Sequence, residues 1–83
     1  MSGEAPRLTV YVRAGCHLCD DMLVALQGWQ PELGFELETR DVDSDPAWAE
    51  RFGPRVPVLA AGDTEICHYF LDINRLRAYL SCA

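Results

Sequence analysis

Two cysteines near the N-terminus, Cys16 and Cys19, are separated by two residues in the order C-H-L-C. A pair at this spacing can cycle between dithiol and disulfide, supply half of a metal site, or pack as two core thiols. The other two of the four cysteines are Cys67 and Cys82. Residues 1–7 lack the basic start and apolar segment of a signal peptide. We therefore expect the protein to be located in the cytoplasm, with its thiols reduced. In that setting a close pair is more often catalytic or metal-binding than a permanent crosslink.

The cysteine pair follows a predicted strand and begins a predicted helix. Residues 7–12 (R-L-T-V-Y-V) are β-branched and aromatic and have apolar side chains on both faces, which predicts a central strand. From residue 17 to residue 30, apolar positions recur every three or four residues, which predicts a helix that ends at Pro31. Cys16 is therefore expected at a helix N-terminus, where free amides and the helix dipole favour a thiolate.

The two cysteines are expected to have different roles. Cys16 is the predicted attacking thiol, and Cys19, on the same face of the first helical turn, is the predicted resolving thiol. We expect His17 to be neutral and to face solvent, because the same helix end disfavours a positive charge. Asp20 and Asp21 oppose the ionisation of Cys16, so the pair is expected to be a moderate reductant.

The rest of the sequence predicts a small α/β domain. Residues 35–40 alternate between apolar or hydroxyl and charged side chains, as in a half-exposed edge strand. Asp45 favours the start of a short helix that Gly53 ends. The remaining predicted elements are strands at 56–61 and 64–70 around the turn Gly62-Asp63, and a last helix capped by Asp72. The order β-α-β-α-β-β-α implies a four-stranded mixed sheet in one domain, residues 1–83.

This order, with C-x-x-C at the first strand-to-helix turn, resembles the thioredoxin fold in its small, glutaredoxin-like form. In that superfamily a cis X-Pro bond faces the cysteines, and R-V-P at residues 55–57 fills its place. The resemblance implies a cis bond before Pro57 and a role for the backbone of Val56 in binding the substrate chain. A trans proline at the start of the strand is the alternative, because cis bonds are rare.

The resemblance also bears on glutathione. Arg13 stands where glutaredoxins usually carry a lysine that binds the glycine carboxylate of glutathione, although a solvated loop arginine is the alternative. Glutaredoxins also carry Gly-Gly after the hairpin, where this chain has Cys67 and His68. Side chains there would block the close approach that glycine permits. We therefore expect no resident cofactor, and glutathione stays only as a candidate reductant. The closer likeness is to small, poorly characterised glutaredoxin-like proteins with similar D-V-D and R-V-P-V-L segments.

Several functional hypotheses follow from the pair. The first is a thiol-disulfide oxidoreductase that acts on a protein or small-molecule disulfide and is recycled by a reductase or glutathione, with Arg13, His17, Val56 and Pro57 as substrate-binding residues. The second is a redox-sensing or partner-binding module with little turnover. The third is a zinc or iron–sulfur site on Cys16 and Cys19, completed in its zinc form by Cys67 and His68. The last alternative for Cys16 and Cys19 is a purely structural pair. For Cys67 and Cys82, the alternative is that they are small, partly buried core residues without a chemical role.

Charge and hydropathy argue against two other classes of partner. Seven basic residues against thirteen acidic residues give a net charge of −6, the wrong sign for a phosphate backbone. The sequence also lacks any stretch that approaches the roughly 20 apolar residues of a membrane span. We expect a monomer that binds neither nucleic acid nor membranes.

Overall fold

The computed structural model describes residues 5–82, and the side chains of residues 5–81. Its strands are β1 (Arg7–Val12), β2 (Glu36–Asp41), β3 (Val58–Ala61) and β4 (Thr64–His68), and its α-helices are α1 (His17–Leu33), α2 (Pro46–Phe52) and α3 (Ile73–Cys82). Two short 3₁₀ helices, η1 (Val42–Ser44) and η2 (Gly53–Arg55), flank α2. The predicted order of elements is confirmed. The prediction for the Cys82 side chain lies outside the described residues.

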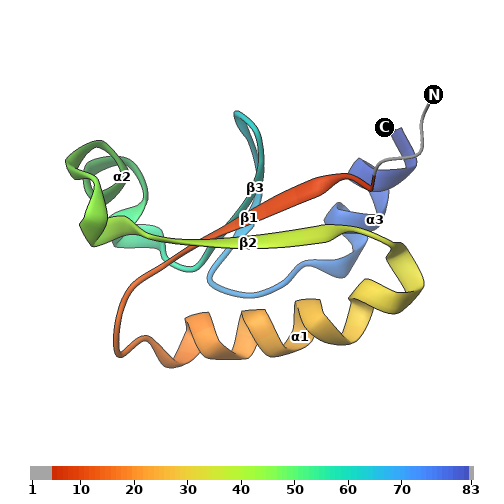
Figure 1. The fold of residues 1–83 in the computed structure, drawn as a ribbon, viewed down its shortest axis with the longest axis horizontal. Helices are drawn as coiled ribbons and strands as arrows, with labels where there is room; N and C mark the ends of the chain where they lie inside the picture. Colours follow the sequence, from red (N-terminus) through yellow and green to blue (C-terminus); the bar gives the residue numbers. More distant parts are fainter. Residues whose placement is uncertain (1–4, 83) are drawn as a thin grey trace.

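The four strands form one mixed sheet in the order β2-β1-β3-β4. β1 runs parallel to β2 and antiparallel to β3, and β3 is antiparallel to β4. β1 is therefore central and β2 is an edge strand, as the sequence predicts. The parallel pair brings the ends of β1 and β2 to the same side of the molecule, with Val12 opposite Asp41 (Figure 1).

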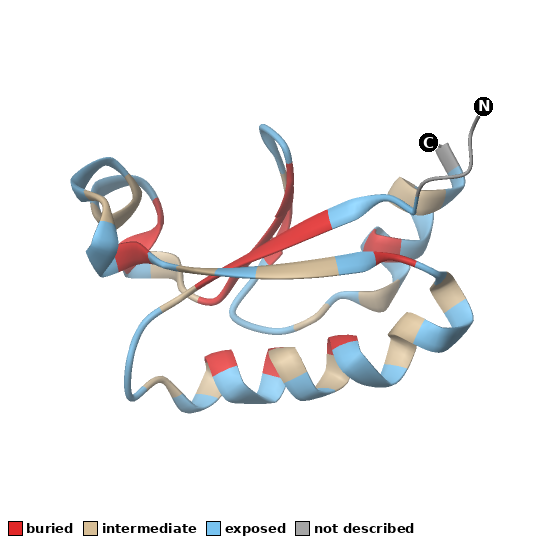
Figure 2. Ribbon diagram, in the orientation of Figure 1, coloured by how far each residue is buried: buried red, intermediate tan, exposed pale blue. Residues whose placement is uncertain are grey.

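Helices cover the two faces of the sheet unequally (Figure 1). On one face, α1 and α3 enclose the larger core, to which the sheet contributes Leu8, Val10 and Leu59. On the other face, the short α2 reaches only the end where β1 and β2 finish. The smaller core there includes Tyr11 and Phe52. Neighbouring residues of β1 fall in different cores because successive strand side chains point to opposite faces. Figure 2 shows the buried residues of α1 facing the sheet.

Helix α1 is longer than predicted. The expected end at Pro31 is wrong, because the helix continues to Leu33 and contains Pro31 in its last turn. A proline at that position removes only one backbone hydrogen bond. The helix ends instead at Gly34, which has a φ of 71° and donates its N–H to the carbonyl of Gln30 at 2.8 Å. Within residues 5–82, no helix is long and apolar enough to cross a membrane.

Two of the predicted helix caps are confirmed and one is wrong. The carboxylate of Asp45 accepts the N–H of Ala47 at 2.9 Å, and that of Asp72 accepts the N–H of Arg75 at 3.1 Å. Gly53 does not take the left-handed conformation of a helix-ending glycine, because its φ is −47°. It continues directly into η2.

The hairpin strands are shorter than predicted at the end that faces α1. Strand β3 begins at Val58 instead of residue 56, and β4 ends at His68 instead of residue 70. The peptide before Pro57 is cis, and Tyr69 has a φ of 66°. Both conformations turn the chain out of an extended path. The residues released from the strands form part of the candidate site.

Candidate active site

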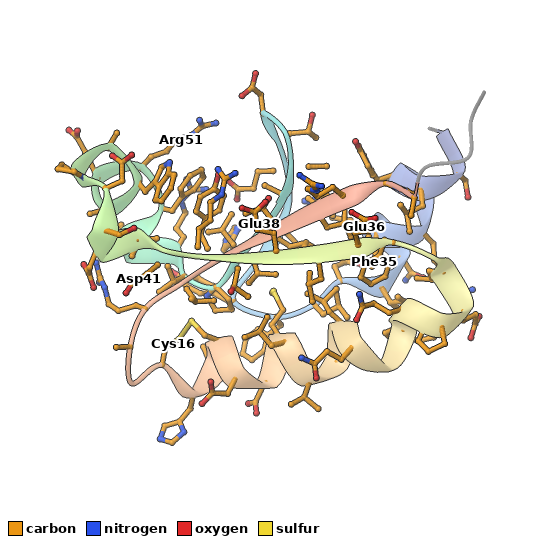
Figure 3. The ribbon with its side chains drawn as sticks, in the orientation of Figure 1. Cys16, Phe35, Glu36, Glu38, Asp41 and Arg51 are labelled. Carbon is orange, nitrogen blue, oxygen red and sulfur yellow. A yellow bond between two sulfur atoms is a disulfide. The ribbon has the colours of Figure 1, made fainter. Side chains whose placement is uncertain are left out.

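Cys16 is the N-terminal cap of α1. Its backbone is extended, with φ −96° and ψ 108°, and its Sγ accepts the N–H of Cys19 at 3.1 Å. The preceding Gly15 has a φ of 76°, a conformation that glycine adopts at little cost. It allows the chain to leave β1 and enter α1 within a short turn. Figure 3 shows Cys16 at the first turn of α1.

The two cysteine side chains have different environments. Cys16 is half-buried, whereas Cys19 is only 2% exposed. Their sulfurs are joined in a disulfide, and their Cα atoms are 5.2 Å apart. His17, between them in sequence, is exposed. The arrangement gives one thiol access to solvent and keeps the second behind it within bonding range.

Pro57 lies at the same end of the sheet as Cys16. The residue after it, Val58, pairs with Tyr11 near the end of β1. The chain that leaves β1 leads directly to Cys16. The Val56–Pro57 peptide is cis and the ring of Pro57 is buried. Within residues 5–82, the backbone N–H and C=O of Val56 form no hydrogen bond, and the residue is half-buried. The segment therefore offers one free donor and one free acceptor.

Tyr69 holds this segment from the β4 side. Its N–H donates to the carbonyl of Pro57 at 2.8 Å, and its hydroxyl donates to the carbonyl of Pro54 at 3.1 Å. The next residue, Phe70, has 68% of its surface exposed. The sequence analysis missed both residues because it placed them in a strand. An aromatic pair just ahead of the helix cap Asp72 was the available signal.

Arg13 is anchored by an ion pair. Its Nε and Nη2 each donate to one carboxylate oxygen of Asp43 at 3.2 Å. Asp43 lies in η1, directly after β2. The guanidinium also passes over Gly53, where a Cβ would come within 2.9 Å of Nη2. Arg13 is therefore an exposed loop arginine whose charge is paired with Asp43.

The described residues do not form the four-ligand zinc site that was one of the alternative hypotheses. Within residues 5–82, no group of three or more His, Cys, Asp or Glu residues has the geometry to hold a metal ion. Cys67 points into the larger core, where burial raises the pKa of its thiol. His68 instead places its Nδ1 3.1 Å from Oε2 of Glu65.

An open groove of about 550 Å³ lies between the end of β4 and the start of α3. Its lining includes Cys67, His68, Phe70, Asp72 and Arg75. Side chains thus line the place where the resemblance to glutaredoxins implies two glycines. The one arginine in the lining of this groove, Arg75, is paired with Asp72 at 3.7 Å.

Comparison with known proteins identifies the family. The model of the family described as "Glutaredoxin-like domain (DUF836)" matches residues 7–81. The chain belongs to this glutaredoxin-like family. The glutaredoxin-like chain is also similar to the uncharacterized protein Rv0508 of Mycobacterium tuberculosis, with 35% identity over 78 residues. The match covers 88% of this chain and 80% of that protein.

Solved structures agree with the fold. Protein Ne2328 of Nitrosomonas europaea is 42% identical, with a TM-score of 0.83 and 92% of each chain covered. Protein XcR50 of X. campestris is 34% identical, with a TM-score of 0.67, covering 92% of this chain and 97% of that chain. Thioredoxin 1 of Thermosipho africanus is 20% identical, with a TM-score of 0.61 and coverage of 92% and 96%, and shows the fold alone. The glutaredoxin-like domain thus has a thioredoxin-like fold, and its Cys16–Cys19 disulfide supports a redox-related role.

Proposed function

We propose that this glutaredoxin-like domain is a thiol-disulfide oxidoreductase. The observation that carries the proposal is the asymmetry of its pair. Cys16 is accessible and its sulfur receives the N–H of Cys19, whereas Cys19 is 2% exposed behind it. An amide donor at a helix N-terminus stabilises a thiolate, which is the attacking form. A purely structural crosslink does not require these differences in exposure and hydrogen bonding.

The proposed reaction transfers two electrons in two exchange steps. The thiolate of Cys16 attacks one sulfur of the substrate disulfide, a new S–S bond forms, and the other sulfur leaves as a thiolate that takes a proton. The thiolate of Cys19 then attacks the sulfur of Cys16 and displaces the second half of the substrate. The substrate is reduced to two thiols, and the pair is oxidised to the disulfide seen in the structure.

The substrate that fits this site best is a disulfide in an extended polypeptide. The free backbone groups of Val56 can pair with such a chain next to Pro57, in the manner of an added strand. Phe70, which is 68% exposed, and Tyr69, which is 40% exposed, offer apolar contact to residues that flank the disulfide. His17 and Arg13 flank Cys16 on the side of α1 and its preceding turn.

Turnover requires an external source of electrons and a reducing compartment. We propose that a dithiol reductase or glutathione returns the pair to the dithiol state in the cytoplasm. Glutathione acts as a reductant and is not a resident cofactor. The domain acts as a monomer, without nucleic acid or membrane as a partner.

A partner-binding module is the second candidate function. It is favoured by His68 and the exposed Phe70, which line the groove and suit a docked chain better than rapid exchange with a small thiol. In that case the domain forms a stable complex that depends on the oxidation state of Cys16 and Cys19, and turnover is slow.

The decisive experiment is a single turnover of the reduced protein with a peptide disulfide, followed by intact mass. Wild type is expected to form the internal disulfide, and Cys19→Ser is expected to accumulate a mixed disulfide on Cys16. Cys16→Ser should lose the reaction, while the control Cys67→Ala should retain it. The proposal fails if Cys16→Ser reacts as fast as wild type. A complex without exchange would select the partner-binding module.

A further inference from the structure

The charges around Cys16 show an imbalance that the reaction alone does not require. Between residues 8 and 39, Arg13 is the only lysine or arginine. Its Nε and Nη2 both donate hydrogen bonds to the carboxylate of Asp43, which offsets its charge. At the cis-proline segment, the guanidinium of Arg55 is likewise paired with the carboxylate of Glu65. The two arginines that flank the site in sequence thus have their charges offset.

The acidic residues at the same end are not offset to the same degree. Asp20 and Asp21 follow Cys19 directly in α1, and within residues 5–82 neither forms an ion pair. Asp41, at the end of β2, lies at the same end of the molecule as Cys16 (Figure 3). An acidic disulfide that approaches Cys16 therefore meets a locally negative surface, and like charges disfavour its approach.

We infer that Asp43 is a specificity-determining residue that acts through Arg13. By holding the guanidinium against Gly53, it offsets the charge of the arginine nearest to Cys16 in sequence, which could otherwise attract an acidic disulfide. The substrate class is then a disulfide flanked by neutral or basic residues, and small acidic disulfides are disfavoured. The inference rests on the proposed exchange reaction of Cys16.

The contacts of Asp43 allow its charge to be removed with little effect on the fold. Its carboxylate is bonded to Arg13, and its backbone N–H donates separately to Asp41 at 2.9 Å. The side chain of Asp43 is 55% exposed, so solvent can replace the lost pair. Asp43→Ala and Asp43→Asn are therefore suitable variants, and thermal unfolding checks that both stay folded.

The test measures second-order rates of reduced protein with three disulfides of different charge. Oxidised glutathione is anionic, hydroxyethyl disulfide is neutral and cystamine is cationic. Asp43→Ala is expected to raise the rate ratio of oxidised glutathione to hydroxyethyl disulfide about fivefold at low ionic strength, an effect that about 1 M salt should abolish because salt screens it. The ratio of cystamine to hydroxyethyl disulfide should fall.

Two comparisons separate this inference from a simple change of net charge. Asp63→Asn makes the same charge change in the β3–β4 turn, at the opposite end of the sheet, and should leave all ratios unchanged. The double variant Arg13→Gln/Asp43→Ala removes both charges of the pair and should return the ratios to those of wild type. Equal ratios in wild type and in Asp43→Ala would overturn the inference. If wild type reacts neither with hydroxyethyl disulfide nor with the peptide disulfide of the single-turnover experiment, the proposed function itself is wrong.

Discussion

The backbone N–H of Tyr69 donates a 2.8 Å hydrogen bond to the carbonyl oxygen of Pro57 and ties the chain after β4 to the cis peptide. The hydroxyl of the same residue reaches the carbonyl of Pro54 at 3.1 Å. One residue, through its backbone N–H and its hydroxyl, thus contacts the segment before β3 at both of its ends. The free backbone of Val56 lies between these two anchors, which fix its position relative to the end of β4.

We predict that Tyr69→Phe lowers the free energy of unfolding by about 0.5–1.5 kcal/mol, because it removes the hydroxyl bond to Pro54 and keeps the ring. Urea denaturation of the oxidised protein measures the change. Tyr79→Phe is the matched control, since within residues 5–82 the hydroxyl of Tyr79 makes no hydrogen bond. Equal losses in both variants would contradict the assigned role of Tyr69.

Cys16 and Cys67 are expected to differ sharply in alkylation. Burial raises the pKa of the Cys67 thiol above its ordinary value of 9.0. In reduced protein at pH 8, iodoacetamide should therefore label Cys16 well before Cys67, as peptide mapping would show. Labelling of Cys67 should become fast in urea, where its burial is lost. Equal rates in the folded state would contradict the buried position of Cys67.

The same shift predicts how stability depends on pH. As pH rises through about 9.0, Cys67 loses its proton in the unfolded chain while the folded state still holds it. The free energy of unfolding of the reduced protein should therefore fall above that pH. Urea titrations at pH 8 and pH 10 measure the fall. In Cys67→Ala the free energy of unfolding should fall less between pH 8 and pH 10 than in wild type. An identical fall in both proteins would rule out a contribution from Cys67.

Gly53→Ala tests the close contact with Arg13. A Cβ at residue 53 would come within 2.9 Å of Nη2, and the flexible guanidinium is the group that must move. Because Gly53 has a φ of −47°, alanine fits its backbone, and stability should change by less than about 1 kcal/mol. Weaker pairing of Arg13 with Asp43 should then reproduce part of the Asp43→Ala charge selectivity. A large loss of stability would show that the guanidinium cannot move.

Two glycines of α1 and its cap should respond in opposite ways to alanine. Gly34 has a φ of 71°, which costs an L residue about 1–2 kcal/mol, so Gly34→Ala should destabilise by that amount. Gly28 lies within the helix, and a Cβ there meets no atom within 4 Å. Gly28→Ala should stabilise by about 0.5–1 kcal/mol because alanine is the better helix former. Thermal and urea unfolding of the two variants, each compared with wild type, measure these changes.

Much of the fold follows from local sequence patterns. The apolar period of α1, the alternation in β2 and the caps Asp45 and Asp72 all depend on near neighbours, which is why they were predictable. The end of α1 was not predictable in this way. A proline in the last turn leaves the other hydrogen bonds of the helix intact, and the helix ends at the C-cap residue Gly34.

The candidate site was predictable only in part. The spacing of Cys16 and Cys19 and their place between a strand and a helix came from the sequence. The Arg13–Asp43 pair joins residues 30 positions apart and depends on the parallel pairing of β1 and β2. The conformation of Tyr69 could not be predicted from the sequence either, because a positive φ is rare for an aromatic residue and leaves no sequence pattern.

The position of β3 inside the sheet bears on product release. Its neighbours β1 and β4 occupy both of its sides, so the free backbone of Val56 is offered at the end of an internal strand. A docked chain can add only a short ladder there, unlike a chain that extends along an edge such as β2. Few bonds then need to break when the reduced product departs. Dissociation is therefore not expected to limit the rate of turnover.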